Sequence, residues 1–130
     1  MTRLVLGTTN RHKGLEMAAL LAPLGLELAT LADYPGQMDV VEDGDSFAAN
    51  ARLKAVQQAT SLGEWVLAED SGLSVDALGG APGIFSARYA GPTATDDANN
   101  DRLLAALAAT PAAERGAHYV CHLTLADPAG

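Results

Sequence analysis

Cysteine, aromatic residues, positive charge and long apolar runs are all scarce in this chain of 130 residues. Cys121 is the only cysteine, so no internal disulfide can form. Eight Lys and Arg residues against 16 Asp and Glu give a formal charge of −8, which leaves no basic face large enough to bind a nucleic-acid polymer. No apolar run approaches the roughly 20 residues of a membrane span, and no signal peptide is recognisable. We therefore expect a cytoplasmic protein that binds neither membranes nor nucleic acid.

The remaining composition is that of a folded protein. Hydrophobic residues make up 48% of the chain and charged residues 18%, and the length predicts one domain over residues 1–130. Apolar periodicity and glycine breaks predict strands at 1–7, 26–31, 65–68 and 117–126, alternating with helices at 11–24, 45–62 and 95–108. This alternation predicts an α/β fold, with a mixed β-sheet flanked by helices and a cleft at the strand ends.

The turn after the first strand reads GTTNRHKG, residues 7–14, and leads into the first helix. Backbone N–H groups at a helix N-terminus bind anions, and Lys13 adds a full charge. The segment is not a P-loop, because His12 and Gly14 stand where that motif needs Gly and Ser or Thr. Two interpretations stay open at this point: a phosphate site, or a helix N-terminus capped by Asn10.

Two further groups of polar residues predict a metal-phosphate site. Asn50 and Lys54 share one face of the second helix, and Glu42 lies just before it, although a lysine on a helix is also typical of a solvated face. Glu69 and Asp70 follow the third predicted strand, where α/β sheets bind ligands, although an acid before Ser71-Gly72 is also ordinary turn chemistry. Hard oxygen ligands such as Glu42 and Asp70 suit Mg²⁺, which binds through one or two carboxylates together with substrate phosphates.

The last strand carries weaker candidates. His118 and His122 lie about 13 Å apart along a strand, too far to share a metal ion. Tyr119, Cys121, Leu123 and Leu125 alternate with them, so we expect these four side chains in the core and Cys121 as a buried hydrophobic residue without a nucleophilic role.

Four segments together resemble one family, the noncanonical purine nucleoside triphosphate pyrophosphatases that act on inosine and xanthosine triphosphates. They are TTNRHK at 8–13, the helix start Glu42…Phe47…Asn50-Ala51…Lys54, EDSGLSVDALGGAPGIFSARYAG from 69, and TDDANNDRLL from 95. The third is highly specific, and the four span almost the whole chain.

The resemblance implies Mg²⁺-dependent hydrolysis of ITP, dITP or XTP to the monophosphate and pyrophosphate, by a homodimer. It implies that Asp70 is the catalytic proton acceptor and that Glu42 and Asp70 bind the metal. It also implies a substrate-binding set of Thr8, Thr9, Asn10, Arg11, His12, Lys13, Lys54 and Ser71.

The chain departs from the family pattern in three places. Thr9 stands where the family usually has Gly, and Glu69 where it often has Asp. Family members also continue for roughly a third of their length beyond Gly130, with segments that hold the base. We therefore expect residues 1–130 to be the N-terminal two-thirds of the fold, and inactive or slow alone. A non-catalytic nucleotide-binding fragment is the main alternative, and a phosphotransferase a weaker one.

Overall fold

The computed structural model describes residues 2–130, so the predicted strand residue Met1 lies outside the described part. The strands are β1 (Arg3–Leu6), β2 (Glu27–Thr30), β3 (Trp65–Val75) and β4 (Ala117–Ala126), and the helices are α1 (Arg11–Leu21), α2 (Phe47–Leu62) and α3 (Asp96–Ala106). The prediction of an α/β fold is confirmed, and β4 has the bounds that the sequence predicted.

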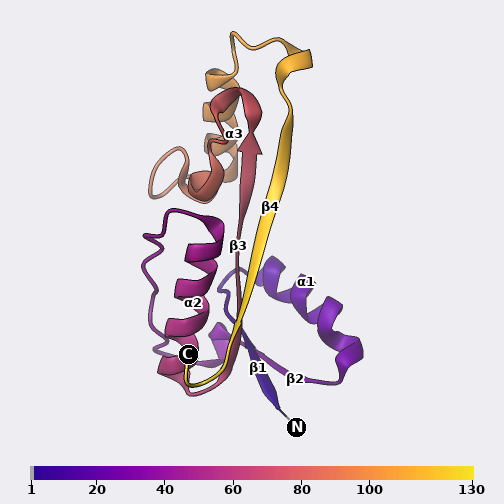
Figure 1. Ribbon diagram of the computed structural model, residues 1–130, viewed down its shortest axis with the longest axis vertical. Helices are drawn as coiled ribbons and strands as arrows, with labels where there is room; N and C mark the ends of the chain where they lie inside the picture. Colours follow the sequence, from indigo (N-terminus) through magenta and orange to yellow (C-terminus); the bar gives the residue numbers. More distant parts are fainter. Residues whose placement is uncertain (1) are drawn as a thin grey trace. The chain divides into compact units, whose positions relative to one another are not determined.

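One four-stranded sheet has the order β2-β1-β3-β4. Strand β1 is parallel to β2, with Val5 opposite Ala29, and parallel to β3, with Val5 opposite Val66. Strand β4 runs against β3, which makes the sheet mixed as predicted (Figure 1). At the start of β1, side-chain hydrogen bonds to Tyr34 and Glu27 raise the pKa of Arg3.

The chain forms two compact units. The first unit comprises the residues up to Glu69 together with His122–Gly130, and the second unit is Asp70–Cys121. Strands β3 and β4 contribute residues to both. No helix among residues 2–130 is both long and apolar enough to cross a membrane.

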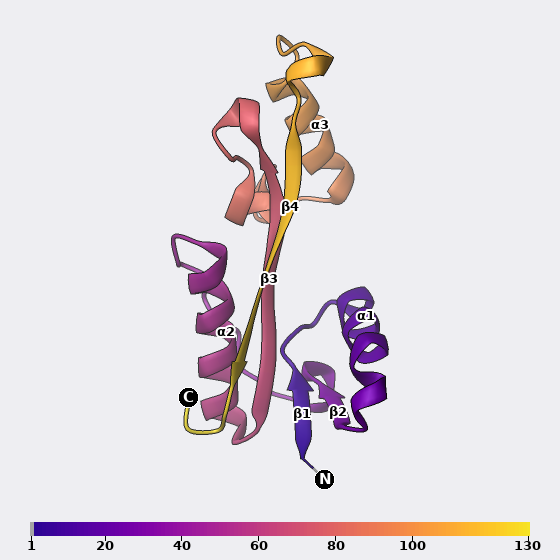
Figure 2. The ribbon, with the colours of Figure 1, turned by 45° about the vertical axis from the view of Figure 1, so that its right-hand side comes forward.

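The core of the first unit lies between the sheet and α2. Helix α1 and helix α2 lie on opposite sides of β1 (Figure 2). The small side chains on one stripe of α2 let the helix approach the strands closely. The buried cluster is made of Val5, Leu31, Ala55, Ala59, Val66, Ala68 and Ala126. This alanine stripe of α2 is buried at Ala51, Ala55 and Ala59, while Ala48 at its start is exposed.

Helix ends follow their local sequence. The hydroxyls of Ser46 and Thr95 accept backbone hydrogen bonds and so cap the N-termini of α2 and α3. Gly25 and Gly63 adopt left-handed conformations after the first and second helical segments. The α-helix predicted over 11–24 ends at Leu21, three residues early. The chain continues from Ala22 to Leu24 as a short 3-10 turn.

Strand β3 corrects one prediction. It extends to Val75, so the prediction that it ends at Ala68 before a turn is wrong, and Glu69 and Asp70 lie in the middle of a strand. Gly72 has no positive φ, so it does not use the backbone freedom that glycine brings to many turns. Pairing with the long strand β4 satisfies the backbone here and overrides the local turn preference.

Strand β4 corrects a second prediction made from the sequence. Tyr119 is 84% exposed, and Cys121, Leu123 and Leu125 are exposed too, so their assignment to the core is wrong. The strand lies at one edge of the sheet, and no element of residues 2–130 buries this face. His118 and His122 are also exposed, as ordinary strand residues can be.

Candidate active site

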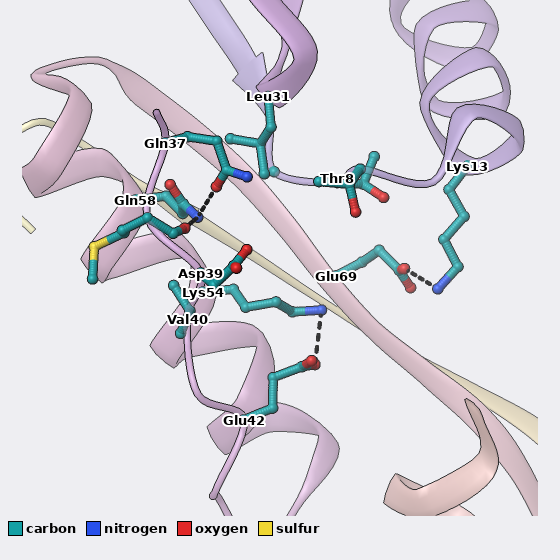
Figure 3. A pocket seen from close by; sticks show the side chains of 13 residues that line it. Thr8, Lys13, Leu31, Gln37, Asp39, Val40, Glu42, Lys54, Gln58 and Glu69 are labelled. Atoms are coloured by element: carbon teal, nitrogen blue, oxygen red, sulfur yellow. Dashed lines mark hydrogen bonds and ion pairs between the residues drawn. The ribbon is translucent and has the colours of Figure 1, made fainter. Parts of the chain in front are cut away.

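A cavity of about 310 Å³ opens in the first unit at the carboxyl ends of β1 and β2 (Figure 3). This volume falls within the range of small-molecule sites. The cavity takes its walls from the turn after β1, the segment before α2, the face of α2 and the middle of β3. Its lining residues are Gly7, Thr8, Thr9, Lys13, Leu31, Gln37, Met38, Asp39, Val40, Glu42, Lys54, Gln58 and Glu69.

The turn after β1 is built by close packing and two side-chain caps. A Cβ on Gly7 would lie 3.0 Å from Val66 Cγ1, so glycine lets β1 approach β3 at this point. The Thr8 hydroxyl accepts a hydrogen bond from Asn10 N at 3.0 Å, and Asn10 Oδ1 accepts one from Lys13 N at 3.2 Å. The predicted cap at Asn10 is thereby confirmed, and α1 begins with its N-terminus beside the cavity.

Thr9, which stands where the family usually has glycine, needs no unusual backbone conformation. Among residues 2–130, positive φ occurs only at glycines, so Thr9 adopts a conformation open to any residue. The turn therefore keeps its shape without the conformational freedom that glycine would supply.

Lys13 reaches across the cavity from α1 to β3. Its Nζ lies 2.5 Å from Oε1 of Glu69, a residue that is only 7% exposed. A carboxylate buried to this extent requires a charged or hydrogen-bonding partner, because desolvation of an isolated charge is costly. The ion pair thus gives the buried carboxyl group of Glu69 a cationic partner in the cavity wall, and Lys13 itself lines the cavity.

Lys54 makes the second ion pair. Its Nζ, on α2, lies 3.1 Å from Oε1 of Glu42 in the segment that precedes the helix. Both side chains are partly buried, and Figure 3 shows the two ion pairs on the same cavity. The sequence prediction that Lys54 and Glu42 lie together is confirmed.

The two adjacent acidic residues of β3, Glu69 and Asp70, have different surroundings. Side chains alternate along a strand, and Glu69 is the one that lines the cavity of the first unit. Asp70 and Ser71 are half-buried residues of the second unit. The catalytic and metal-binding roles of Asp70, and the contact of Ser71 with substrate, stay predictions.

The remaining predicted residues divide between the lining and the surroundings. Thr8 and Thr9 line the cavity, whereas Arg11 and His12 are exposed on the first turn of α1 and do not. Asn50 is buried and does not line the cavity, and its Oδ1 accepts a hydrogen bond from Gly44 N.

Several lining residues went unrecognised in the sequence, namely Leu31, Gln37, Met38, Asp39, Val40 and Gln58. Most belong to a stretch without periodicity, which offers no pattern to read. Gln58 did leave a signal, because it lies four residues after Lys54 on the same helix face, at the edge of the alanine stripe.

The lining suits a divalent cation that binds together with phosphates. It places Asp39, Glu42 and Glu69 around one cavity with two lysines. No cluster of three or more His, Cys, Asp or Glu residues arranged to hold a metal occurs among residues 2–130. Mg²⁺ does not need such a cluster, since it keeps several waters and binds through one or two carboxylates and substrate phosphates. The carboxylates of this lining are therefore of the kind that binds a divalent cation such as Mg²⁺ together with phosphates.

Known proteins resemble this chain over nearly all of its length. The chain is 53% identical to the dITP/XTP pyrophosphatase of Rhodopirellula baltica over 130 residues, which are all of this chain and 62% of that protein. It is 47% identical to the dITP/XTP pyrophosphatase of Desulforamulus reducens, over 98% of this chain and 64% of that protein. The chain thus spans less than two-thirds of the length of these relatives.

Solved structures agree in fold. A HAM1 protein from Coxiella burnetii superposes with a TM-score of 0.89 at 37% identity, covering 99% of this chain and 65% of that one. The Ham1 protein of Staphylococcus aureus gives 0.84 at 35% identity, covering 98% and 64%. The Ham1 family profile matches residues 4–130. On this match and these identities, the chain belongs to the Ham1 family.

Proposed function

We propose that the protein hydrolyses noncanonical purine nucleoside triphosphates, of the type of dITP, ITP and XTP, to the monophosphate and pyrophosphate. The carrying observation is the pair of lysine–carboxylate contacts made between different elements around one cavity, Lys13 with Glu69 and Lys54 with Glu42. The dITP/XTP pyrophosphatases that match the chain from end to end support the same activity.

The cavity is arranged to exchange one set of anions for another. Each lysine is paired with a carboxylate, which neutralises its charge and holds it at the cavity. A triphosphate brings oxygens that can take over these contacts, because ammonium groups bind phosphate as point charges. The N–H groups at the start of α1 add donors for the same phosphates. Lys13 and Lys54 would thus neutralise the charge that develops on pyrophosphate as it leaves.

The metal-binding part of the proposal assigns Mg²⁺ to Glu42 and Asp70. Bound Mg²⁺ would supply charge neutralisation on the phosphate oxygens. Asp70 would orient the attacking water and take its proton, a role open to a carboxylate within hydrogen-bonding reach. Ser71, Thr8, Thr9, Asn10, Arg11 and His12 complete the proposed substrate-binding set. A homodimer, which the family resemblance implies, completes the proposal.

Product analysis by the full-length native protein tests this function. The substrates are dITP, ITP and XTP, with ATP and GTP as matched controls, at saturating Mg²⁺. We expect pyrophosphate and the nucleoside monophosphate, with turnover of the first three well above that of the controls. Release of orthophosphate, or transfer to an acceptor alcohol, would identify a different reaction. Binding of nucleotide without turnover would identify a nucleotide-binding protein.

A further inference from the structure

The segment 37–44, which carries Glu42 and Asp39 into the cavity, has no helix or strand of its own. Irregular segments are usually mobile unless side chains satisfy and hold their backbone. A candidate metal ligand on such a segment must be held in place by something else, because catalytic geometry tolerates little error in position.

Helix α2 holds this segment at three points along one stripe. Asn50, Lys54 and Gln58 are spaced four residues apart, so they lie in a row on the same side of the helix. Asn50 Oδ1 accepts a hydrogen bond from Gly44 N at 2.8 Å. Lys54 pairs with Glu42. Gln58 Nε2 donates to the carbonyl of Met38 at 2.6 Å and to Gln37 Oε1 at 3.0 Å (Figure 3).

The two outer members of this row are more deeply buried than Lys54. Asn50 is 1% exposed and Gln58 is 4% exposed. The contact at Asn50 is also sterically specific, because a Cβ on Gly44 would lie 2.7 Å from Asn50 Oδ1 and 2.8 Å from Ala49 Cβ. Only glycine lets the backbone at position 44 come this close to the helix.

The contact at Gln58 has an unfavourable side. Its Oε1 is buried and accepts no hydrogen bond from any residue of the described chain, 2–130. The amide cannot be reversed to correct this, because its oxygen would then face the carbonyl oxygen of Met38. An apolar side chain would avoid the desolvation of Oε1. A role in stability alone therefore does not account for glutamine at this position, whereas a role in fixing the segment does.

We propose that Asn50 and Gln58 are positioning residues that hold segment 37–44 on α2, so that Glu42 stays at the cavity when Lys54 leaves it for substrate phosphate. The middle contact of the row is the one that substrate binding would break, and the outer two contacts keep the segment in place. The expected effect on catalysis rests on the proposed function. The expectation that Asn50 and Gln58 hold segment 37–44 in place does not.

The test compares Gln58→Leu with Gln57→Leu in the full-length native protein. Leucine matches glutamine in size and lacks its hydrogen bonds. Gln57 is the neighbouring glutamine on α2, and the hydrogen bonds to Gln37 and Met38 are made by Gln58. We expect Gln58→Leu to speed amide hydrogen exchange across residues 37–44 at least tenfold. It should also raise the Mg²⁺ concentration for half-maximal turnover about tenfold, as loss of residues that orient metal ligands does. Gln57→Leu should change neither quantity.

A second pair covers the case in which Gln58→Leu does not fold. Asn50→Asp retains an oxygen that accepts from Gly44 N, whereas Asn50→Ala does not. We expect normal exchange at 37–44 in Asn50→Asp and accelerated exchange in Asn50→Ala. Lower thermal stability with unchanged exchange and unchanged Mg²⁺ requirement would overturn the proposal. Accelerated exchange in the variants, combined with a wild-type protein that releases no pyrophosphate, would support the holding of the segment and reject the proposed function. The two failures can therefore be told apart.

Discussion

The two compact units of this chain are stabilised in different ways. The first unit has a cluster of buried aliphatic side chains between the sheet and α2. In the second unit, whose residues are all described, only Val75, Pro82 and Leu107 are buried. Apolar burial is the dominant favourable term in folding, so the first unit supplies most of the hydrophobic stabilisation that the described residues provide.

The second unit relies on side chains that bind its backbone. Ser86 Oγ accepts a hydrogen bond from Leu73 N at 2.9 Å, which joins β3 to a 3-10 turn. Asn99, on α3, accepts from Ala90 N at 2.8 Å and donates to the carbonyl of Ala87 at 3.1 Å. Such bonds contribute about 0.5–1.5 kcal/mol each in net terms. The cavity with the two lysine–carboxylate pairs thus belongs to the unit with the apolar core, while the second unit relies more on polar contacts.

The largest expected effect compares the acids on either side of the boundary between the units. Asp70→Asn removes the charge proposed to hold Mg²⁺ and accept a proton, and loss of a general base lowers the rate by about 10²–10⁴. Glu69→Gln should cost less, since Glu69 pairs with Lys13. Turnover across a Mg²⁺ titration, with circular dichroism to confirm folding, measures both. If Glu69→Gln is the more damaged variant, the roles of the two acids are reversed.

The second prediction concerns the lysines of the first unit. Lys13→Met and Lys54→Met keep the length of the side chain and remove its charge. Hydrogen bonds to charged groups contribute about 1.5–3 kcal/mol, so binding of a triphosphate should weaken roughly ten- to a hundredfold. Binding of the monophosphate, which carries fewer phosphate oxygens, should change less. Equal losses for the two nucleotides would argue that the lysines act elsewhere, and calorimetry with a non-hydrolysable triphosphate analogue and Mg²⁺ makes the measurement.

The third prediction tests the contrast between the units through stability. Val66 is fully buried in the first unit, and Val66→Ala should destabilise the protein by about 2–3 kcal/mol through lost burial and the cavity left behind. Ser86→Ala, in the second unit, leaves Leu73 N without this acceptor and should cost about 1–2 kcal/mol. Urea unfolding of both variants provides the comparison. A larger loss for Ser86→Ala would mean that polar contacts dominate stability after all.

The smallest expected effect concerns two glycines of the first unit, Gly14 and Gly7, and how closely their surroundings pack. Gly14 lies inside α1, where a Cβ would meet Thr30 Cγ2 and Thr8 Cγ2 at an ordinary 3.8 Å. Gly14→Ala should therefore stabilise the protein by about 0.5–1 kcal/mol, because alanine favours the helix. Gly7→Ala is the control, since its Cβ would crowd β3, and it should destabilise by about 1 kcal/mol or more. Thermal unfolding of the two variants measures these changes in stability. Destabilisation by Gly14→Ala would show that α1 packs more tightly here than the distances imply.

Local signals in the sequence determined the elements and several of their ends. Thr95 and Asn10 are caps because their short polar side chains bond nearby backbone N–H groups, and Gly63 ends α2 because it adopts a left-handed conformation without strain. These interactions span only three or four residues, so the sequence contains all their parts. The spacing of Glu42 and Lys54 likewise placed two cavity residues correctly.

Only the tertiary structure decided the length of β3, the exposure of β4 and the part played by Gln58. Glu69 to Gly72 read as a turn, but pairing with β4 supplies long-range hydrogen bonds that a local reading does not include. Tyr119 and Leu123 have the alternation of core residues, yet burial depends on whether another element lies over that face, and alternation cannot say so. Gln58 became informative only when segment 37–44, which has no periodicity, was seen to lie against it. Local chemistry thus determined how each element forms, whereas contacts between residues distant in sequence determined which side chains meet in the cavity.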